Sequence, residues 1–171
     1  MTVPNTMRGV LAPVVTPFKA DLSADKDRLI AHCKWLLSQD SGLAIFGTNS
    51  EATSLTMDER FELIDALVEV GIDPARMMPG TGCCSFFESV ALTKHAIELG
   101  CGGVLMLPPF YYKGVSDEGI YRNFAEIIER TGDDRLRIYL YHFPQMSAVP
   151  FSIALVGRLL ENFPGIVVGM K

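Results

Sequence analysis

Lys171 ends the apolar run GIVVGMK and is the residue of this chain with the clearest capacity for covalent chemistry. The run follows Pro164 and has the composition of a buried β-strand. Because side chains alternate between the two faces of a strand, Val167, Gly169 and Lys171 are expected to share one face. A lysine ammonium is costly to remove from water, so a lysine on such a strand needs a specific reason to be there.

Hydroxyl groups stand near the ends of two other strand-like runs, at Thr48 and at Tyr141. An uncharged lysine attacks a keto carbon to form a Schiff base, and burial favours the uncharged form. Tyr141 is placed to move the protons of that reaction, with a second hydroxyl from Thr48 or Tyr111 as a relay. The turn at Thr48 and Asn49 offers backbone N–H groups that can bind a carboxylate. Together these groups are a workable set for Schiff-base catalysis on a ketone that also carries a carboxylate.

The elements that must position these residues alternate between strand-like and helix-like segments. Apolar, β-branched runs predict strands over residues 10–18, 42–48, 77–81, 103–107, 137–143 and 165–171. Amphipathic spacing predicts helices over residues 24–38, 56–70, 86–99, 116–130 and 152–162, with a capping box at 56–59 and a stop at Gly100. The apolar stripe of the 56–70 helix is expected at Phe61, Ile64, Leu67 and Val68. Apolar strands between such helices indicate a parallel sheet covered by helices.

Two architectures fit this alternation, a doubly wound open sheet and a (β/α)8 barrel. The first strand is not followed by the GxGxxG turn of a dinucleotide-binding sheet, which favours the barrel. We therefore predict the α/β class and a (β/α)8 TIM barrel, with about the first six strands present in this chain. Residues 1–171 are expected to be the N-terminal part of a single barrel domain that continues for roughly another 100 residues. Barrels build active sites at the carboxyl ends of their strands, which would bring Thr48, Tyr141 and Lys171 to one mouth.

Composition argues against several other classes of function. The chain has 171 residues and a formal net charge of −5, and it shows no basic stripe of the kind that nucleic acids or anionic membranes require. Its first residues do not have the pattern of a signal peptide, and no apolar run reaches the ~20 residues that span a bilayer. The four cysteines have no CxxC spacing and no histidine partners at zinc-binding distance. We expect reduced thiols, no metal and a cytoplasmic protein.

Four segments, in order, resemble the dihydrodipicolinate synthase / N-acetylneuraminate lyase family, which are pyruvate-dependent class I aldolases on a TIM barrel. GTNSEATSLTMDER (47–60) is similar to the family pattern GTTGE…LT-x-x-E-R. PPFYYKGVSDEGIYRNF (108–124) is similar to PPYYYKPSQEGLY-x-x-F. YLYHFP (139–144) is similar to LYNVP, and GIVVGMK (165–171) to N-I-V-G-I-K. The resemblance covers essentially the whole chain from APVVTPF (12–18) onward.

The resemblance implies a role for each residue singled out above. Lys171 would be the Schiff-base lysine, Tyr141 the catalytic tyrosine and Thr48 the relay hydroxyl. The backbone N–H groups of Thr48 and Asn49 would bind the pyruvyl carboxylate. Tyr111 would match the relay tyrosine that family members lend across a dimer interface.

Tyr112 is the alternative to Tyr111 and is predicted as a substrate-binding residue. The loop around Gly114 and Val115 is one residue longer than the family pattern, which leaves the register between the two tyrosines open. The resemblance also implies a homodimer or homotetramer, no metal or organic cofactor, and a small 2-oxo acid such as pyruvate as the substrate.

Three departures from the family pattern bear on the second substrate. Met146 stands where dihydrodipicolinate synthases have an arginine for the carboxylate of aspartate semialdehyde, and such charge-assisted bonds contribute ~1.5–3 kcal/mol each. Asn49 and Ser50 replace a threonine and a glycine, and the runs GTN (47–49) and GMK (169–171) are more similar to the 4-hydroxy-2-oxoglutarate aldolase branch. We predict a lyase or synthase that makes or breaks an aldol bond to a 2-oxo acid. The alternatives are a 4-hydroxy-2-oxoglutarate or 2-keto-3-deoxy sugar acid aldolase or dehydratase, a true dihydrodipicolinate synthase despite Met146, and a non-catalytic 2-oxo acid binding protein.

Overall fold

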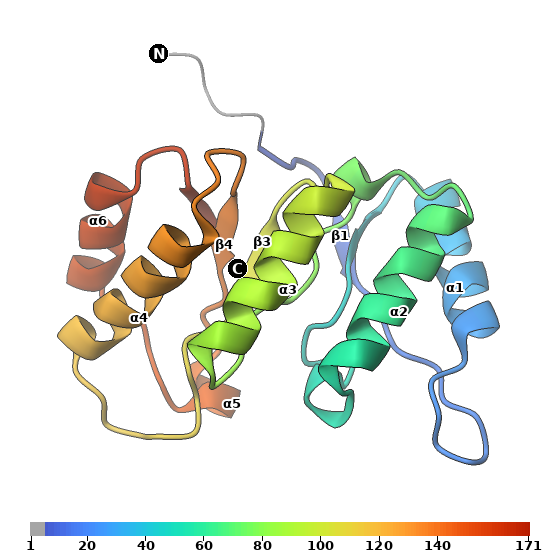
Figure 1. Ribbon diagram of the computed structural model, residues 1–171, viewed down its shortest axis with the longest axis horizontal. Coiled ribbons are helices and arrows are strands. Elements are labelled where there is room, and N and C mark those ends of the chain that lie inside the picture. Colours follow the sequence, from blue (N-terminus) through green and yellow to red (C-terminus); the bar gives the residue numbers. More distant parts are fainter. Residues whose placement is uncertain (1–5) are drawn as a thin grey trace.

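The structure is a computed structural model that describes residues 6–171, in which strands and helices alternate along the chain (Figure 1). The strands are β1 (Leu11–Pro13), β2 (Gly42–Ala44), β3 (Val104–Met106), β4 (Ile138–Leu140) and β5 (Val167–Met170). The α-helices are α1 (Lys26–Ser38), α2 (Met57–Glu69), α3 (Phe86–Leu99), α4 (Asp117–Thr131), the short α5 (Pro144–Ser147) and α6 (Ile153–Asn162). Two 3-10 turns, η1 (Ala52–Ser54) and η2 (Pro74–Arg76), lie in the loops on either side of α2.

The pairing between these strands is parallel throughout, as their apolar character predicts. β1 pairs with β2, while β3, β4 and β5 form a second sheet in that order. Residues 77–81 link the two sheets: the Met78 N–H donates to the Leu43 carbonyl at 2.8 Å, and the Thr81 N–H donates to the Leu105 carbonyl at 3.0 Å. The third predicted strand is therefore present as a connection made of single bridges and not as a regular strand.

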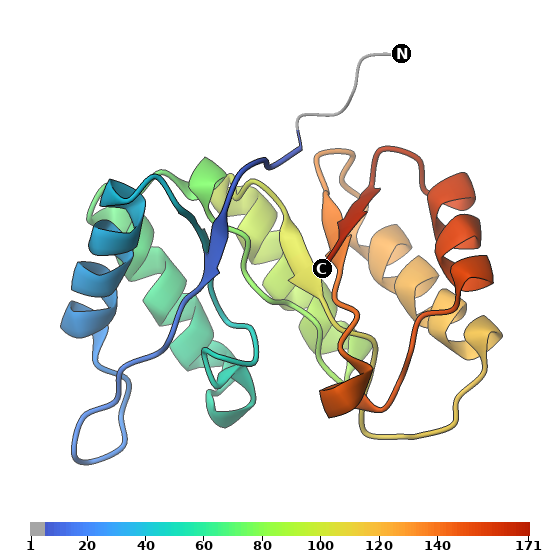
Figure 2. The same cartoon turned by 180° about the vertical axis from the view of Figure 1, so that it is seen from behind.

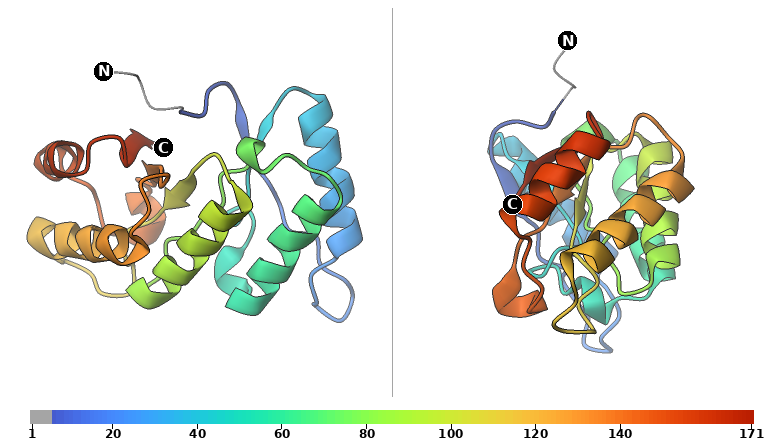
Figure 3. Two further views of the ribbon diagram at one scale, coloured as in Figure 1. Left: turned by 45° about the horizontal axis from the view of Figure 1, so that its top comes forward. Right: turned by 90° about the vertical axis from the view of Figure 1, so that its left-hand side faces the viewer.

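The helices cover one face of the strands, and Figure 2 shows the strands from the opposite side. In β3, Val104 and Met106 belong to the core shared with α3, α4 and α6. Leu105 points the other way, where it packs in a second cluster with Ala44 and Tyr141. The right-hand view of Figure 3 shows the molecule from the side, with α2, α3 and α4 on one side of the strands. The side chains of the uncovered face are thus the ones that a barrel of this type encloses.

Polar residues begin the helices, and a glycine ends α3, close to the positions that the sequence predicts. Thr56 and Glu59 form the capping box of α2, since each side chain accepts a hydrogen bond from the backbone N–H of the other residue. The bonds from Thr56 also lower the pKa of the Glu59 carboxyl, which favours its charged form at the helix start. Ser85 and Ser116 cap α3 and α4, and Gly100 ends α3 in a left-handed conformation (φ 85°).

The buried face of α2 differs from the predicted stripe by one position. Phe61 and Val68, both predicted to be buried, are only half-buried. The residues that α2 does bury are Arg60, Leu63, Ile64, Ala66 and Leu67. A charged side chain, Arg60, therefore lies inside the molecule among apolar neighbours.

Two strands end earlier than predicted because the backbone turns away. Phe46 adopts a left-handed conformation (φ 56°), so β2 ends at Ala44 and a loop leads to Thr48. After β4, Pro144 begins the helix α5. Proline at the first position of a helix is a start signal. The sequence prediction treated Pro144 only as the end of a strand and missed this helix.

The predicted alternation along β5 is wrong at Val167. Val167 is buried in the helix-side core, whereas Gly169 lies against the ring of Tyr139 on the other face. The register shifts at this point, because Ile138 pairs with Val167 but Tyr139 pairs with Gly169. One extra residue in a strand reverses the faces of the residues before it. Gly169 and Lys171 therefore share the inner face without Val167.

Gly80→Ala tests the close approach between residues 77–81 and the loop after β2. A Cβ at Gly80 would overlap the Phe46 carbonyl, which is backbone and cannot move without displacing that loop. We expect the substitution to lower the free energy of unfolding by about 1–3 kcal/mol in urea denaturation, the usual cost of overpacking. Gly157→Ala in α6 is the matched control, because a Cβ there meets nothing within 4 Å. It is expected to stabilise the helix by ~0.5–1 kcal/mol, and the same sign at both positions would contradict the packing argument.

Candidate active site

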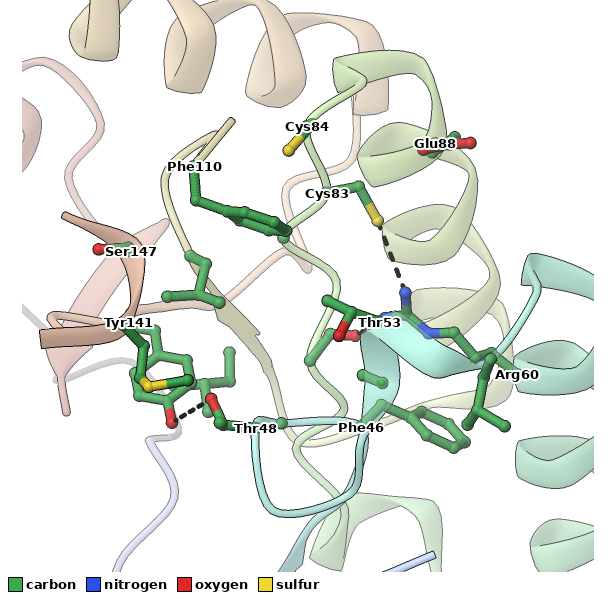
Figure 4. A pocket seen from close by; sticks show the side chains of 18 of the residues that line it. Phe46, Thr48, Thr53, Arg60, Cys83, Cys84, Glu88, Phe110, Tyr141 and Ser147 are labelled. Atoms are coloured by element: carbon green, nitrogen blue, oxygen red, sulfur yellow. Dashed lines mark hydrogen bonds between the residues drawn. The ribbon is translucent and has the colours of Figure 1, made fainter. Parts of the chain in front are cut away.

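Three side chains from three segments of the chain meet at the hydroxyl group of Tyr141. Its oxygen lies 3.1 Å from Thr48 Oγ1, a contact drawn in Figure 4. The same oxygen accepts a hydrogen bond from Lys171 Nζ at 3.3 Å. Tyr141 is only 4% exposed, so its hydroxyl is held in place by packing as well as by these bonds. The structure thus brings together three of the residues that the sequence predicts to act together.

Backbone pairing places Lys171 beside Tyr141. The Lys171 N–H donates to the Leu140 carbonyl, and the Lys171 carbonyl accepts from the His142 N–H, both at 2.8 Å. The Lys171 amine lies 4.4 Å from the centroid of the Tyr141 ring, which is a cation–π distance. Lys171 is nevertheless exposed, because within the described residues β5 has a neighbouring strand on one side only. The burial expected for this amine is therefore not provided by residues 6–171.

The loop after β2 presents Thr48 between two residues of left-handed backbone, Phe46 (φ 56°) and Glu51 (φ 51°). Non-glycine residues seldom adopt this conformation, and such strain is concentrated at functional sites. Ser50 ties the loop to the chain that follows β1: its hydroxyl donates to a backbone carbonyl there, and its carbonyl accepts from the Thr16 hydroxyl at 2.7 Å. These bonds are buried and hold the strained loop in one position.

Backbone N–H groups at this loop are free to bind a ligand. Neither the Thr48 nor the Asn49 amide donates a hydrogen bond to any group in residues 6–171. Asn49 is exposed, so water or a solute can reach it. Successive amides in a turn are a known means of binding an anion. The free amides agree with the carboxylate-binding role of Thr48 and Asn49, which stays a prediction.

The inner face below the site is filled by the ring of Tyr139. A Cβ at Gly103 would lie 2.7 Å from this ring, and a Cβ at Gly169 would lie 2.6 Å from it. Glycine is therefore required on both neighbouring strands so that the ring can lie across them. The Tyr139 hydroxyl accepts a hydrogen bond from the Met7 N–H at 2.7 Å, which holds the N-terminal segment against this end of the sheet.

A cavity of about 550 Å³ opens beside Tyr141 and Thr48 (Figure 4). This volume is in the range of ordinary small-molecule sites, roughly 300–1,000 Å³. Lys171 contacts Tyr141 but does not line this cavity. The labelled residues of its wall are Phe46, Thr48, Thr53, Arg60, Cys83, Cys84, Glu88, Phe110, Tyr141 and Ser147.

Arg60 is a residue of this wall that the sequence prediction missed. Its side chain is almost completely buried, with 6% of the residue exposed. The available signal was its spacing, because Arg60 stands three and four residues before Leu63 and Ile64 on the buried face of α2. A charged residue at a core position of an amphipathic helix indicates either a buried polar contact or a functional role.

Tyr111 and Tyr112 are not part of the cluster at Tyr141. They are 73% and 75% exposed, and their rings contact each other edge to face with centroids 5.2 Å apart. Neither hydroxyl has a hydrogen-bond partner within the described residues. The preceding residue, Phe110, is the one whose side chain lines the cavity. The relay and substrate-binding roles of the two tyrosines remain predictions.

Met146 lies on α5 at the edge of the cavity and is 63% exposed. The side chain at the position that the sequence comparison matched to an arginine of dihydrodipicolinate synthases is therefore uncharged and partly open to solvent. Among residues 6–171, no group of three or more histidine, cysteine or carboxylate side chains is arranged to hold a metal ion. Over the same residues, none of the helices combines the length and the apolar character needed to cross a bilayer.

Comparison with known proteins identifies relatives of the chain. Residues 6–171 match the sequence profile of the Dihydrodipicolinate synthetase family. The 4-hydroxy-tetrahydrodipicolinate synthase of Desulforamulus reducens is 35% identical over 159 residues, which are 92% of this chain and 52% of that protein. The crystal structure of dihydrodipicolinate synthase from Agrobacterium tumefaciens has a TM-score of 0.92 and 35% identity, covering 95% of this chain and 57% of that one. The dihydrodipicolinate synthase from Acinetobacter baumannii complexed with pyruvate has a TM-score of 0.85 and 30% identity, covering 99% of this chain and 55% of that one.

The chain therefore belongs to the dihydrodipicolinate synthetase family. Its alternating helices and parallel strands are part of a (β/α)8 barrel, so the predicted fold class is confirmed. The chain spans about half the length of the curated relatives it matches.

Thiol reactivity provides a test of the packing of the core and of the cavity wall. Burial raises the pKa of the Cys33 and Cys101 thiols to about 12, and it also raises that of Cys83 against the opposing charge of Arg60. Cys84 is exposed. Because the thiolate is the reactive form, we expect iodoacetamide at mildly alkaline pH to modify Cys84 first in the folded protein, as measured by peptide mass spectrometry. Denaturant should make all four react alike, and early labelling of Cys33 in the folded protein would contradict the assignment.

Proposed function

We propose that the protein is a Schiff-base-forming lyase or synthase that acts on pyruvate or a related 2-oxo acid. The observation that carries the proposal is the contact of Lys171 Nζ and Thr48 Oγ1 with the same phenol oxygen of Tyr141. Family membership supports it, as does the pyruvate complex of the relative from Acinetobacter baumannii. An amine, a phenol and a hydroxyl in one chain are the groups that nucleophilic attack on a ketone and the accompanying proton transfers need.

In the first proposed step, the uncharged Lys171 amine attacks the keto carbon of the 2-oxo acid. A proton moves from nitrogen to oxygen to give a carbinolamine, whose hydroxyl then leaves as water to form an iminium ion. Tyr141 is the group positioned to carry these protons, since its oxygen contacts the Lys171 amine. The Thr48 hydroxyl, 3.1 Å from the phenol, can return a proton to Tyr141 after each transfer. The free amides of Thr48 and Asn49 hold the carboxylate of the substrate.

In the second proposed step, the bond between the carbon next to the iminium and the carbon beyond it breaks, and the iminium accepts its electrons. For aldol cleavage, a base removes the proton of the substrate hydroxyl, the carbon–carbon electrons move to the iminium to give an enamine, and the aldehyde leaves. Protonation of the enamine carbon followed by addition of water releases pyruvate and restores the Lys171 amine. Condensation is the same sequence reversed, with Tyr141 and Thr48 as the proton carriers in both directions.

The cavity beside Tyr141 bears on the second substrate. At the position of Met146 the wall offers no cation, so a carboxylated aldehyde such as aspartate semialdehyde loses a charge-assisted bond there. We therefore favour a 2-keto-3-deoxy sugar acid whose aldehyde product lacks a carboxylate over dihydrodipicolinate synthesis. For 4-hydroxy-2-oxoglutarate, whose aldehyde glyoxylate is itself carboxylated, the support is the sequence resemblance that includes Asn49 and not the lack of a cation at Met146. The exposed Tyr111 and Tyr112 further suggest that a second copy of the chain covers this side of the site, in a homodimer or homotetramer.

Pyruvate followed by borohydride tests the covalent step directly. Reduction of the iminium fixes the pyruvyl group to nitrogen, so intact-mass analysis should show one adduct for each chain, and peptide mapping should place it on Lys171. Tyr141→Phe should slow formation of the adduct by about 10²–10⁴-fold, since it removes the proton carrier.

Two lysine variants complete this experiment. Lys171→Met should abolish the adduct, while Lys94→Met on the exposed side of α3 should leave it unchanged. Reversible binding of pyruvate without any adduct would support the non-catalytic alternative and overturn the proposed activity.

Met146→Arg tests the basis of substrate choice. A guanidinium at this edge of the cavity supplies the missing bond to a carboxylated aldehyde. We expect kcat/KM for condensation of pyruvate with aspartate semialdehyde to rise by about tenfold or more, from ~1.5–3 kcal/mol per charge-assisted bond. Met146→Gln, which has similar length and no charge, is the control in the same coupled assay. An equal gain with glutamine, or none with arginine, would show that charge at this position does not select the aldehyde.

A further inference from the structure

We infer that Arg60 is a positioning residue that holds the loop carrying Thr48 in its working conformation. The inference rests on the proposed function, because the loop matters for catalysis only if the Thr48 hydroxyl and the Thr48 and Asn49 amides act on the substrate. Arg60 comes from α2 and reaches across the cavity wall toward the loop after β2 (Figure 4).

The guanidinium of Arg60 connects α2 with two other segments of the chain, residues 80–83 and the loop after β2. Nη2 donates to the Gly80 carbonyl, and Nη1 donates to Cys83 Sγ at 3.5 Å. The guanidinium carbon lies 5.7 Å from the centroid of the Phe46 ring. A planar group with several donors and a stacking face makes these contacts at once, which lysine cannot do.

These contacts act on the residues that lead directly to Thr48. The Gly80 N–H donates to the Ile45 carbonyl at 2.8 Å, and the Gly80 backbone packs against the Phe46 carbonyl so closely that no side chain fits between them. Phe46 has the strained left-handed backbone that ends β2, and Thr48 follows two residues later. Arg60 therefore fixes Gly80 from one side and the Phe46 ring from the other, which maintains the strained conformation between them.

The charge of Arg60 argues against a purely structural role. Within residues 6–171, no carboxylate lies within 4.0 Å of its guanidinium, and its buried Nε has no hydrogen-bond partner. Burying a cation without a counter-charge opposes folding, and an apolar side chain of similar size fills such a space at lower cost. Retention of arginine here is better explained by the geometry it imposes on the loop.

Amide hydrogen exchange tests this inference independently of activity. In Arg60→Met, peptides that cover residues 46–51 should exchange at least about tenfold faster, while those from the core of α2 stay protected. Arg60→Lys keeps the charge but only part of the contacts, so it should give an intermediate rate. Phe46→Leu removes the stacking partner and is expected to shift exchange in the same direction. It replaces Arg60→Met in the experiment if that variant folds poorly. Arg122→Met, on the exposed surface of α4, is the matched control and should change nothing.

Kinetics with pyruvate and borohydride provide the functional readout. A displaced loop should raise the KM for pyruvate in Arg60→Lys by about ten- to a hundredfold, while the end-point fraction of chains that form the adduct stays that of the wild type. A merely structural defect would instead lower that fraction and leave KM unchanged. Unchanged exchange over residues 46–51 in both Arg60 variants overturns the inference. So does a KM for pyruvate in Arg60→Lys equal to that of the wild type, when the wild type does form the adduct. Absence of the adduct in the wild type overturns the proposed function alone, because hydrogen exchange still decides the role of Arg60.

Discussion

The phenol oxygen of Tyr141 is the point on which the rest of the site depends. It joins Thr48 and Lys171, which lie 93 and 30 positions away in the sequence. Both contacts require that the ends of β2, β4 and β5 lie level with one another in the strand layer. On one side, the ladder between β4 and β5 meets this requirement through the bond from the Lys171 N–H to the Leu140 carbonyl. A slip of one residue would turn Lys171 toward the helices and separate the amine from the phenol. The parallel register is therefore as much a part of the candidate site as the side chains are.

Close approach of backbone to ring and of backbone to backbone is the second constraint, and it explains residues with no chemistry of their own. Gly103 and Gly169 are glycines because Tyr139 lies across both, and Gly80 is one because the Phe46 carbonyl occupies the space of a side chain. Gly169, two residues before Lys171, thus makes room for the Tyr139 ring on the inner face below the site. The irregularity of β5 places Val167 in the helix-side core and still leaves Lys171 on the inner face.

Local signals and periodicity were enough to predict the alternating architecture and the meeting of Thr48, Tyr141 and Lys171. Caps such as Thr56 with Glu59 are encoded within four residues, so the sequence reveals them directly. Features that depend on distant neighbours were not predictable in this way. The left-handed backbone of Phe46 and the bulge beside Val167 result from packing between segments far apart in the chain. Lys171 is exposed although burial was expected. Whether its side chain is buried depends on the segments that surround β5, which the sequence of the strand alone does not predict.

The division between rigid and adjustable parts has a consequence for the proposed chemistry. Lys171 and Tyr141 are held by backbone ladder bonds. Thr48 is held by a loop that is bonded to the chain following β1 and packed against residues 77–81. Met146 stands on a helix of four residues at the cavity edge, where a substitution disturbs little packing. Schiff-base formation would depend on the first group and choice of aldehyde on the second. With this division, the second substrate can change while the proposed covalent step, which depends on the strand register, stays the same.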